Sequence, residues 1–180
     1  MGRAALKKER HEIMLKKLEQ NPFLKDEDLA RVFNVSVSTI RFDRAELGIA
    51  EYRERLKAAA KNGVHPPAAA EVLDLNLFRD GLSVLETDSS MVFAGTNIVK
   101  SQCIYSFAED LALSVINAKA ALVKVANVKY ISCVRSGQRM VAKSKVARIK
   151  DKEFIVHVII KVDMNEVFRG KFSLAVQEEK

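Results

Sequence analysis

Hydroxyl and guanidinium side chains gather in one short stretch near the start of the chain. The stretch SVSTIRFDRAELGI has polar residues that can stand outward at the beginning of a helix, namely Ser36, Ser38, Thr39, Arg41 and Arg44. Hydroxyls and backbone N–H groups at a helix N-terminus bind phosphates, and arginine side chains read guanine edges in the major groove of DNA. These residue types in this order predict contact with DNA.

A helix-turn-helix is the element that must position these side chains. A short helix is expected after Asp26, Asn34 and Val35 make the turn, and Ser36 opens a second helix that ends near Gly48. The alternative is a three-helix protein-interaction domain whose arginines are only solvated. The hydroxyl-rich start of the second helix favours DNA binding.

Composition and charge agree with an anionic partner. The chain has 180 residues, 48% of them hydrophobic, so it can bury a sizeable core and is not a disordered or collagen-like chain. Its 30 basic and 23 acidic residues give a net charge of +7. Three basic residues are expected just before the first helix, where they can neutralise phosphates: Lys7, Lys8 and Arg10.

Cysteine, histidine and hydropathy patterns exclude several other classes of protein. The two cysteines form no CxxC motif and the three histidines are far apart in the sequence, so no metal site and no catalytic metal are predicted. The charged start lacks the apolar core of a signal peptide, and no stretch of about 18 apolar residues follows. We therefore expect a cytoplasmic protein without a membrane partner.

Periodicity divides the chain into three parts. Residues 1–48 have helical spacing and form the expected helix-turn-helix domain, and residues 71–180 form a second domain with strand-like spacing. Between them, residues 49–70 comprise an amphipathic helix and a hinge at GVHPPAAA. This linker helix is either a switch that docks on the second domain in one state or a fixed spacer.

The second domain is predicted to be α+β, with the order β-β-α-β-β-β-β. The first strand, EVLDLNLF, places Leu73, Leu75 and Leu77 on one face, and Asp80-Gly81 signals a tight turn. A wide apolar stripe over residues 98–117 predicts one long helix, and further strand-like runs follow it. One apolar helix is best buried when the antiparallel sheet curls around it.

Three segments together resemble the FapR family, regulators of bacterial fatty-acid and phospholipid synthesis. They are VSVSTIRFDRAELGIAEYRERL at residues 35–56, MVF, and VRSGQRMVAKSKV, so the resemblance covers nearly the whole chain. It implies a DeoR-type helix-turn-helix joined to a hot-dog fold, in which a curved sheet wraps one central helix. It also implies a homodimeric transcriptional repressor, without a cofactor, that leaves its palindromic operator DNA when malonyl-CoA binds.

The resemblance also assigns effector-binding positions. Phe93 matches a ligand-pocket aromatic, Lys100 stands where the family has an arginine for the malonyl carboxylate, and Ser101 replaces a glycine. Glu109 replaces an asparagine, and its charge would repel a malonyl carboxylate in the same pocket. One hypothesis is that Lys100 pairs with Glu109 and leaves a pocket for another acyl-CoA. Arg135 is a further candidate for binding a phosphate or carboxylate.

Two rival functions remain at this point. A carboxylate on the central helix resembles hot-dog thioesterases, so Glu109 or Asp110 is a candidate catalytic acid of an acyl-CoA thioesterase. The preceding loop, NIVKSQ, lacks a glycine pair for a thioester oxyanion, and we therefore expect no enzyme and no catalytic residue. A pure interaction module is the other rival, and it predicts neither a ligand nor DNA.

Overall fold

The computed structural model describes residues 3–55, 70–118 and 120–177. The chain divides into two compact units, residues 1–59 and residues 60–180, which are described separately below. No helix in these described ranges is long and apolar enough to cross a membrane.

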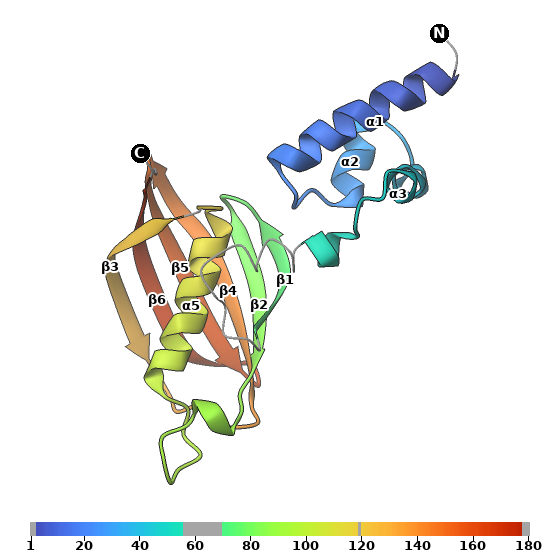
Figure 1. Cartoon of the computed structure of the whole chain (residues 1–180). Helices are drawn as coiled ribbons and strands as arrows, with labels where there is room; N and C mark the ends of the chain where they lie inside the picture. Colours follow the sequence, from blue (N-terminus) through green and yellow to red (C-terminus); the bar gives the residue numbers. More distant parts are fainter. Residues whose placement is uncertain (1–2, 56–69, 119, 178–180) are drawn as a thin grey trace. The chain divides into compact units, whose positions relative to one another are not determined.

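The first unit is a bundle of three helices (Figure 1), α1 (Arg3–Gln20), α2 (Asp26–Phe33) and α3 (Val37–Glu46). Asn34 ends α2 in the left-handed conformation, with φ of 50°, and Ser36 is the N-cap of α3. The predicted helix-turn-helix is therefore confirmed. Its core consists of one apolar cluster from all three helices: Met14, Leu18, Leu29, Ala30 and Ile40.

The predicted linker helix is only partly described. Gly48 has φ of 66° and ends the preceding helix, so residues 49–51 are not helical and the next helical residues are 52–55. Arg55 donates hydrogen bonds to the carbonyl oxygens of Pro22, Leu24 and Ala50, at 2.9, 2.6 and 2.5 Å. These bonds anchor residues 52–55 on the loop between α1 and α2. The rest of the predicted linker and hinge, 56–69, lies outside the described residues.

The second unit is one six-stranded antiparallel sheet with a helix against one face (Figure 1). The elements are β1 (Ala70–Asn76), β2 (Asp80–Glu86), a short 3-10 helix η1 (Ser89–Met91), α5 (Ser101–Val115), β3 (Ala121–Tyr130), β4 (Arg139–Lys150), β5 (Glu153–Val162) and β6 (Asn165–Val176). In space the strands follow the order β1-β2-β4-β5-β6-β3. The predicted α+β order and hot-dog fold are confirmed.

The core of this unit lies between α5 and the sheet. The predicted apolar stripe of α5 is fully buried: Ile104, Phe107, Ala108, Leu111, Ala112, Val115 and Ile116. On β6, Phe168, Gly170 and Phe172 alternate with exposed residues and so share the buried face of the strand. Tyr130 and Tyr105 make edge contacts with the rings of Phe168 and Phe172, at centroid distances of 5.2 and 5.7 Å.

Two details of the first hairpin differ from the prediction. The turn comprises residues 77–79, with Phe78 at φ of 61°, and Asp80 already begins β2. Gly81 is needed for packing rather than for a turn, because a Cβ there would lie 3.0 Å from Leu111 Cδ1. Leu73 is 37% exposed, since a β-bulge between Val72 and Asp74 breaks the alternation that was expected to bury it.

Gly170 leaves the space that two aromatic rings occupy, which gives a first prediction. A Cβ at Gly170 would lie 2.6 Å from Phe172 Cε2 and 3.0 Å from Phe168 Cε1, and both rings are completely buried. Gly170→Ala should therefore lower the free energy of unfolding by about 1–3 kcal/mol, the usual cost of overpacking. Urea unfolding of the full chain measures it. The control is Lys171→Ala, which changes the exposed residue next to Gly170. An equal loss of unfolding free energy in this control would contradict the overpacking explanation.

Candidate nucleic-acid interface and effector site

The start of α3 brings together the hydroxyls that the sequence singled out. Ser36 Oγ accepts a hydrogen bond from the backbone N–H of Thr39 at 3.1 Å, and it lies 2.8 Å from both Ser38 Oγ and Thr39 Oγ1. The Arg41 side chain is 67% exposed, although its Nε lies 3.7 Å from Asp26 Oδ2. A helix N-terminus with three hydroxyls and a nearby exposed guanidinium can bind phosphate and base edges.

Arg44 does not stand outward as predicted. It lies four residues after the core residue Ile40 and therefore on the same, buried face of α3. Its guanidinium donates from Nε to Asp26 Oδ1 at 3.1 Å and from Nη1 to the Ile49 carbonyl oxygen at 3.0 Å. Arg44 therefore holds α3 against α2 and the segment after α3. Its predicted orientation was wrong, because the residues were placed by type and not by helical angle.

A second buried charge, Asp43, fastens α3 to α1. Its carboxylate is 2% exposed and accepts hydrogen bonds from Arg10 Nε at 2.6 Å and His11 Nε2 at 2.9 Å. Burial by itself would raise the pKa of Asp43, but these hydrogen bonds and the Arg10 charge outweigh burial and hold the pKa below its usual value. Lys7, Lys8 and Arg10 all lie inside α1, so the prediction that they precede the first helix is wrong. Arg10 binds Asp43 of α3 and is not free to meet phosphates as predicted.

The same corner holds the one group with metal-binding geometry among the described residues. Ligand atoms of His11, Asp43 and Glu46 lie within 4.8 Å of one another, although the histidines are scattered in the sequence. Both carboxylates already have cationic partners, because Arg10 binds Asp43 and Lys7 Nζ lies 2.5 Å from Glu46 Oε2. This arrangement acts as an ion-pair network between α1 and α3.

The outward stripe of α3 contains one residue that the sequence reasoning missed. Ser38, Arg41, Phe42 and Ala45 are all exposed and follow the i, i+3, i+4, i+7 spacing of one helix face. Phe42 is 77% exposed, so this aromatic ring is not part of the core of the unit. The same spacing was available in the sequence, but Phe42 was passed over because it is neither polar nor charged.

The Asp43 network generates a second prediction. Asp43→Asn keeps the shape of the side chain but leaves the Arg10 guanidinium without its buried charged partner. Breaking one side of a buried ion pair costs about 3–5 kcal/mol, so the first unit should unfold at lower urea. Circular dichroism at the helical signal measures this. Arg31→Ala removes an exposed pair with Asp28 and is the control, with an expected change of at most about 1 kcal/mol.

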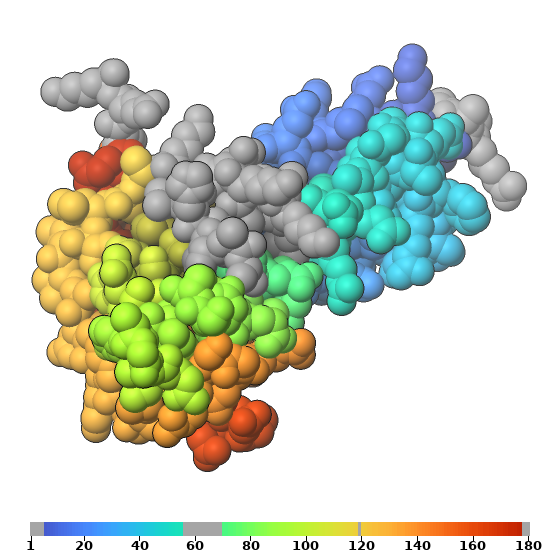
Figure 2. Space-filling view, turned by 60° about the horizontal axis from the view of Figure 1, so that its bottom comes forward, coloured from blue at the N-terminus to red at the C-terminus, as the bar shows by residue number. Residues whose placement is uncertain are grey.

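In the second unit, four of the five predicted effector residues lie around the start of α5, and Ser101 is its first residue. Lys100 is the N-cap residue of α5, and the exposed Phe93 lies on the loop that leads to it. Arg135 Nη1 donates to Asn97 Oδ1 at 2.8 Å, and the Val99 N–H donates to the Val134 carbonyl oxygen at 2.8 Å. Residues 92–99 and 134–136 are therefore joined through the buried Val99 and Val134, and residues 93–97 and Arg135 are exposed beside them. Figure 2 shows residues 92–99 in light green.

Glu109 lies elsewhere on the helix. It is nine residues beyond Lys100, which is about 13 Å along the axis and half a turn around it, so the two cannot pair as hypothesised. Instead, Glu109 follows Tyr105 by one turn, and burial together with the Glu109 charge raises the pKa of Tyr105. Burial also raises the pKa of Glu109 itself. Glu109 therefore lies on the same face of α5 as Tyr105.

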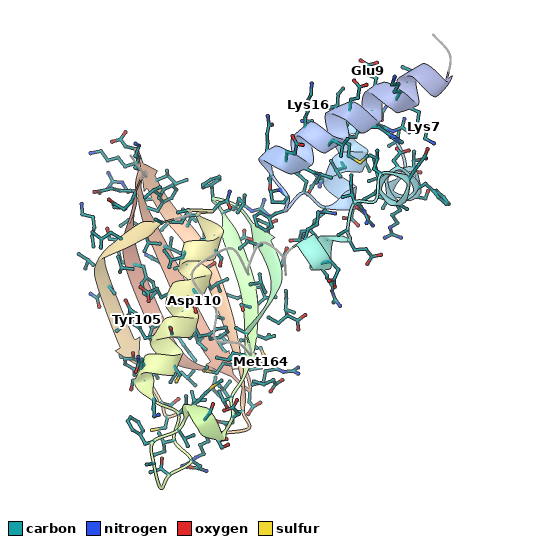
Figure 3. The ribbon with its side chains drawn as sticks, viewed as in Figure 1. Lys7, Glu9, Lys16, Tyr105, Asp110 and Met164 are labelled. Atoms are coloured by element: carbon teal, nitrogen blue, oxygen red, sulfur yellow. The ribbon has the colours of Figure 1, made fainter. Side chains whose placement is uncertain are left out.

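Asp110 is the most perturbed acid in the described part of the chain. Its side chain is 9% exposed, and its Oδ2 is buried without a hydrogen-bond partner. Burial and the neighbouring Glu109 charge raise the pKa of Asp110 to about 7. Figure 3 labels Asp110 and Tyr105 on α5. At neutral pH the carboxyl is therefore partly protonated and can donate a hydrogen bond.

A third prediction follows from this pKa. The folded protein keeps the Asp110 proton up to about pH 7, whereas the unfolded chain loses it near pH 3.8, so the free energy of unfolding falls as pH rises between these values. The loss reaches about 4 kcal/mol above pH 7. Asp110→Asn should remove this slope and stabilise the second unit at pH 8. Urea unfolding from pH 5 to 8 tests this, with the exposed Asp151→Asn as control; an unchanged slope in Asp110→Asn contradicts it.

Comparison with known proteins identifies both units. Residues 10–56 match the DeoR-like helix-turn-helix domain. The transcription factor FapR of Caldanaerobacter subterraneus subsp. tengcongensis is 48% identical over 96% of this chain and 90% of its own, and that of Bacillus cereus B4264 is 34% identical over 97% and 93%.

Solved structures resemble the second unit. An uncharacterized protein of Pyrococcus horikoshii covers 64% of this chain and 88% of its own, with a TM-score of 0.60 and 22% identity. A hypothetical thioesterase of Streptococcus pneumoniae, solved with coenzyme A, covers 69% and 98%, with a TM-score of 0.59 and 8% identity. These likenesses show the hot-dog fold. The identity to the curated relatives over nearly the whole chain shows that this protein belongs to the FapR family of DNA-binding transcription factors.

Proposed function

We propose that this protein represses genes of fatty-acid and phospholipid synthesis from palindromic operator DNA, and that an acyl-CoA ester releases it. The observation that carries the DNA-binding part is the exposed stripe of α3, which is held from behind by Asp43 and Arg44. A recognition helix must be rigid, because base contacts depend on side chains placed to within a fraction of an ångström. Ser36, Ser38, Thr39 and Arg41 are the proposed DNA contacts, and Arg44 supports them.

A homodimer is the proposed assembly. Strand β3 is at the edge of the sheet, is ten residues long and carries the exposed apolar residues Leu122 (58%) and Val125 (61%). A long apolar edge strand is a ready template for pairing with another strand. Two copies joined at this edge have twofold symmetry, which a palindromic operator matches. We propose that the protein acts in the cytoplasm, because the operator DNA that it would bind lies there.

The surface at the start of α5 is the proposed binding site for the coenzyme A ester. Lys100 and Arg135 supply two positive charges, Phe93 an exposed aromatic ring, and the backbone of Ser101 opens a helix whose N-terminus favours anions. The positive charges and the helix N-terminus can bind the phosphates of coenzyme A, and the aromatic ring can stack on its adenine. Among structures with this fold, one from Streptococcus mutans was solved with acetyl CoA bound.

The acyl group is expected to approach α5 on the side of Glu109. Burial disfavours negative charge in this region, as the raised pKa of Glu109 indicates, and the neighbouring Asp110 has an unpaired oxygen. The region therefore disfavours a ligand carboxylate and can offer a hydrogen bond to a neutral carbonyl. An ester without a terminal carboxylate therefore fits Glu109 better than malonyl-CoA does. If the effector is malonyl-CoA, as the family resemblance implies, Lys100 and Arg135 are the cationic groups of this surface that would neutralise its carboxylate.

The second candidate function is hydrolysis of the ester. Asp110 favours it, because a buried carboxyl with a pKa of about 7 can act as an acid or a base at neutral pH. The loop before α5 contains no glycine pair that would bring backbone N–H groups to a thioester oxygen. We therefore propose a binding site without turnover.

A fourth prediction concerns release from DNA. Anisotropy of a labelled duplex, selected from a random pool by this protein, is measured with malonyl-CoA, acetyl-CoA and free coenzyme A. We expect an ester to lower DNA affinity, and Glu109→Gln to improve release by malonyl-CoA at least about fivefold, because one carboxylate repulsion is removed.

Arg41→Ala should weaken the DNA complex, and it should reduce the salt dependence of DNA binding if Arg41 contacts phosphate.

Three outcomes would contradict the proposal. Failure to enrich any duplex excludes DNA binding as described, and a DNA complex that no coenzyme A ester disturbs excludes the effector. Loss of the thioester during the titration, abolished by Asp110→Asn, would establish hydrolysis instead. Lys161→Ala, an exposed change on β5 outside the proposed DNA, effector and dimer surfaces, is the matched control and should leave all three readings unchanged.

A further inference from the structure

The exposed face of α3 carries an aromatic ring where a DNA-binding helix needs polar groups. Phe42 is 77% exposed and is flanked on its own stripe by Ser38, one turn before it, and Arg41, the preceding residue. On the opposite face, Ile40 is completely buried, so the register of α3 is fixed with Phe42 outward. The packing of the first unit does not account for this ring.

A phenyl ring on a DNA-reading face has one apolar partner in the major groove. Among the four bases, only thymine presents a methyl group there, on its C5 atom, and phenylalanine is one of the side chains that pack against it. Phosphates and sugars provide no comparable apolar contact. The neighbouring Arg41 can read guanine O6 and N7, so the stripe combines a donor for guanine with an apolar surface for thymine.

We propose that Phe42 reads the C5 methyl of one thymine in each operator half-site and so sets base specificity beside the Arg41 contact. This inference rests on the proposed DNA binding and adds the chemical feature that is read. Because the ring does not hydrogen bond, it discriminates thymine from cytosine and from uracil by the methyl group and not by base pairing. A specificity role of this kind does not require Phe42 for folding.

Deoxyuridine provides the direct test, since it pairs like thymine and lacks only the methyl group. The duplex that the full-length protein selects is resynthesised with each thymine replaced singly by deoxyuridine, and affinities are measured by anisotropy. For the wild type we expect one position per half-site to lose about fourfold, the effect of burying one methyl-sized group. The Phe42→Ala variant should bind duplexes with thymine or deoxyuridine at this position with equal affinity. The Phe42→Leu variant should keep part of the affinity difference between the two duplexes.

The controls separate this inference from the fold and from DNA binding itself. Val32→Ala removes an exposed apolar side chain from α2 (53% exposed) and should preserve the full pattern of deoxyuridine sensitivity. Thermal unfolding of Phe42→Ala should match the wild type, because the ring is solvated. If Phe42→Ala keeps every deoxyuridine effect of the wild type, Phe42 does not read a thymine methyl. If the wild type selects no duplex at all, the DNA-binding proposal itself fails.

Discussion

Two buried charges on one face of α3 hold the DNA-binding unit in its shape. Asp43 accepts from Arg10 and His11 of α1, and Arg44 donates to Asp26 of α2. A three-helix unit of this size has a small apolar core, and packing alone does not specify the rotation of α3 about its axis. The directional hydrogen bonds of Asp43 and Arg44 specify this rotation. That rotation decides which residues of α3 face outward. The exposed stripe of Ser38, Arg41 and Phe42 is therefore a consequence of the residues on the other side of the helix.

The second unit depends on the fit of one helix to a curved sheet. Small residues are placed where the two approach closely, as Gly81 is beside Leu111 and Gly170 is between Phe168 and Phe172. The apolar stripe of α5 covers the sheet, whereas Tyr105 and Glu109 on the same helix are only partly buried. A buried acid in this setting, such as Asp110, is costly when ionised. Acids with a strongly perturbed pKa are more frequent at functional sites, and this supports the effector binding proposed for this unit.

A sensor that controls DNA binding needs a ligand with different affinities for two states of the protein. The second unit supplies groups whose protonation or pairing a ligand can change, at Glu109, Asp110 and the cationic surface around Arg135. The first unit holds α3 in one orientation through the Asp43 and Arg44 ion pairs. Regulation is then expected to change the availability or spacing of two intact recognition helices rather than their internal structure.

Periodicity in the sequence predicted the helix-turn-helix, the order of strands and helix along the second unit, and the buried stripe of α5, because helical and strand periodicities report which residues face a core. It also identified Ser36, Ser38, Thr39 and Arg41 as a group, since these residues are close along one helix. It placed Arg44 outward, overlooked Phe42 and paired Lys100 with Glu109. These points depend on contacts between elements, because the partners of Asp43 and Arg44 come from other helices, and because burial of Asp110 depends on the sheet packed around it. Residue type predicts chemistry, but the direction and charge state of a side chain are set by neighbours that are distant in sequence.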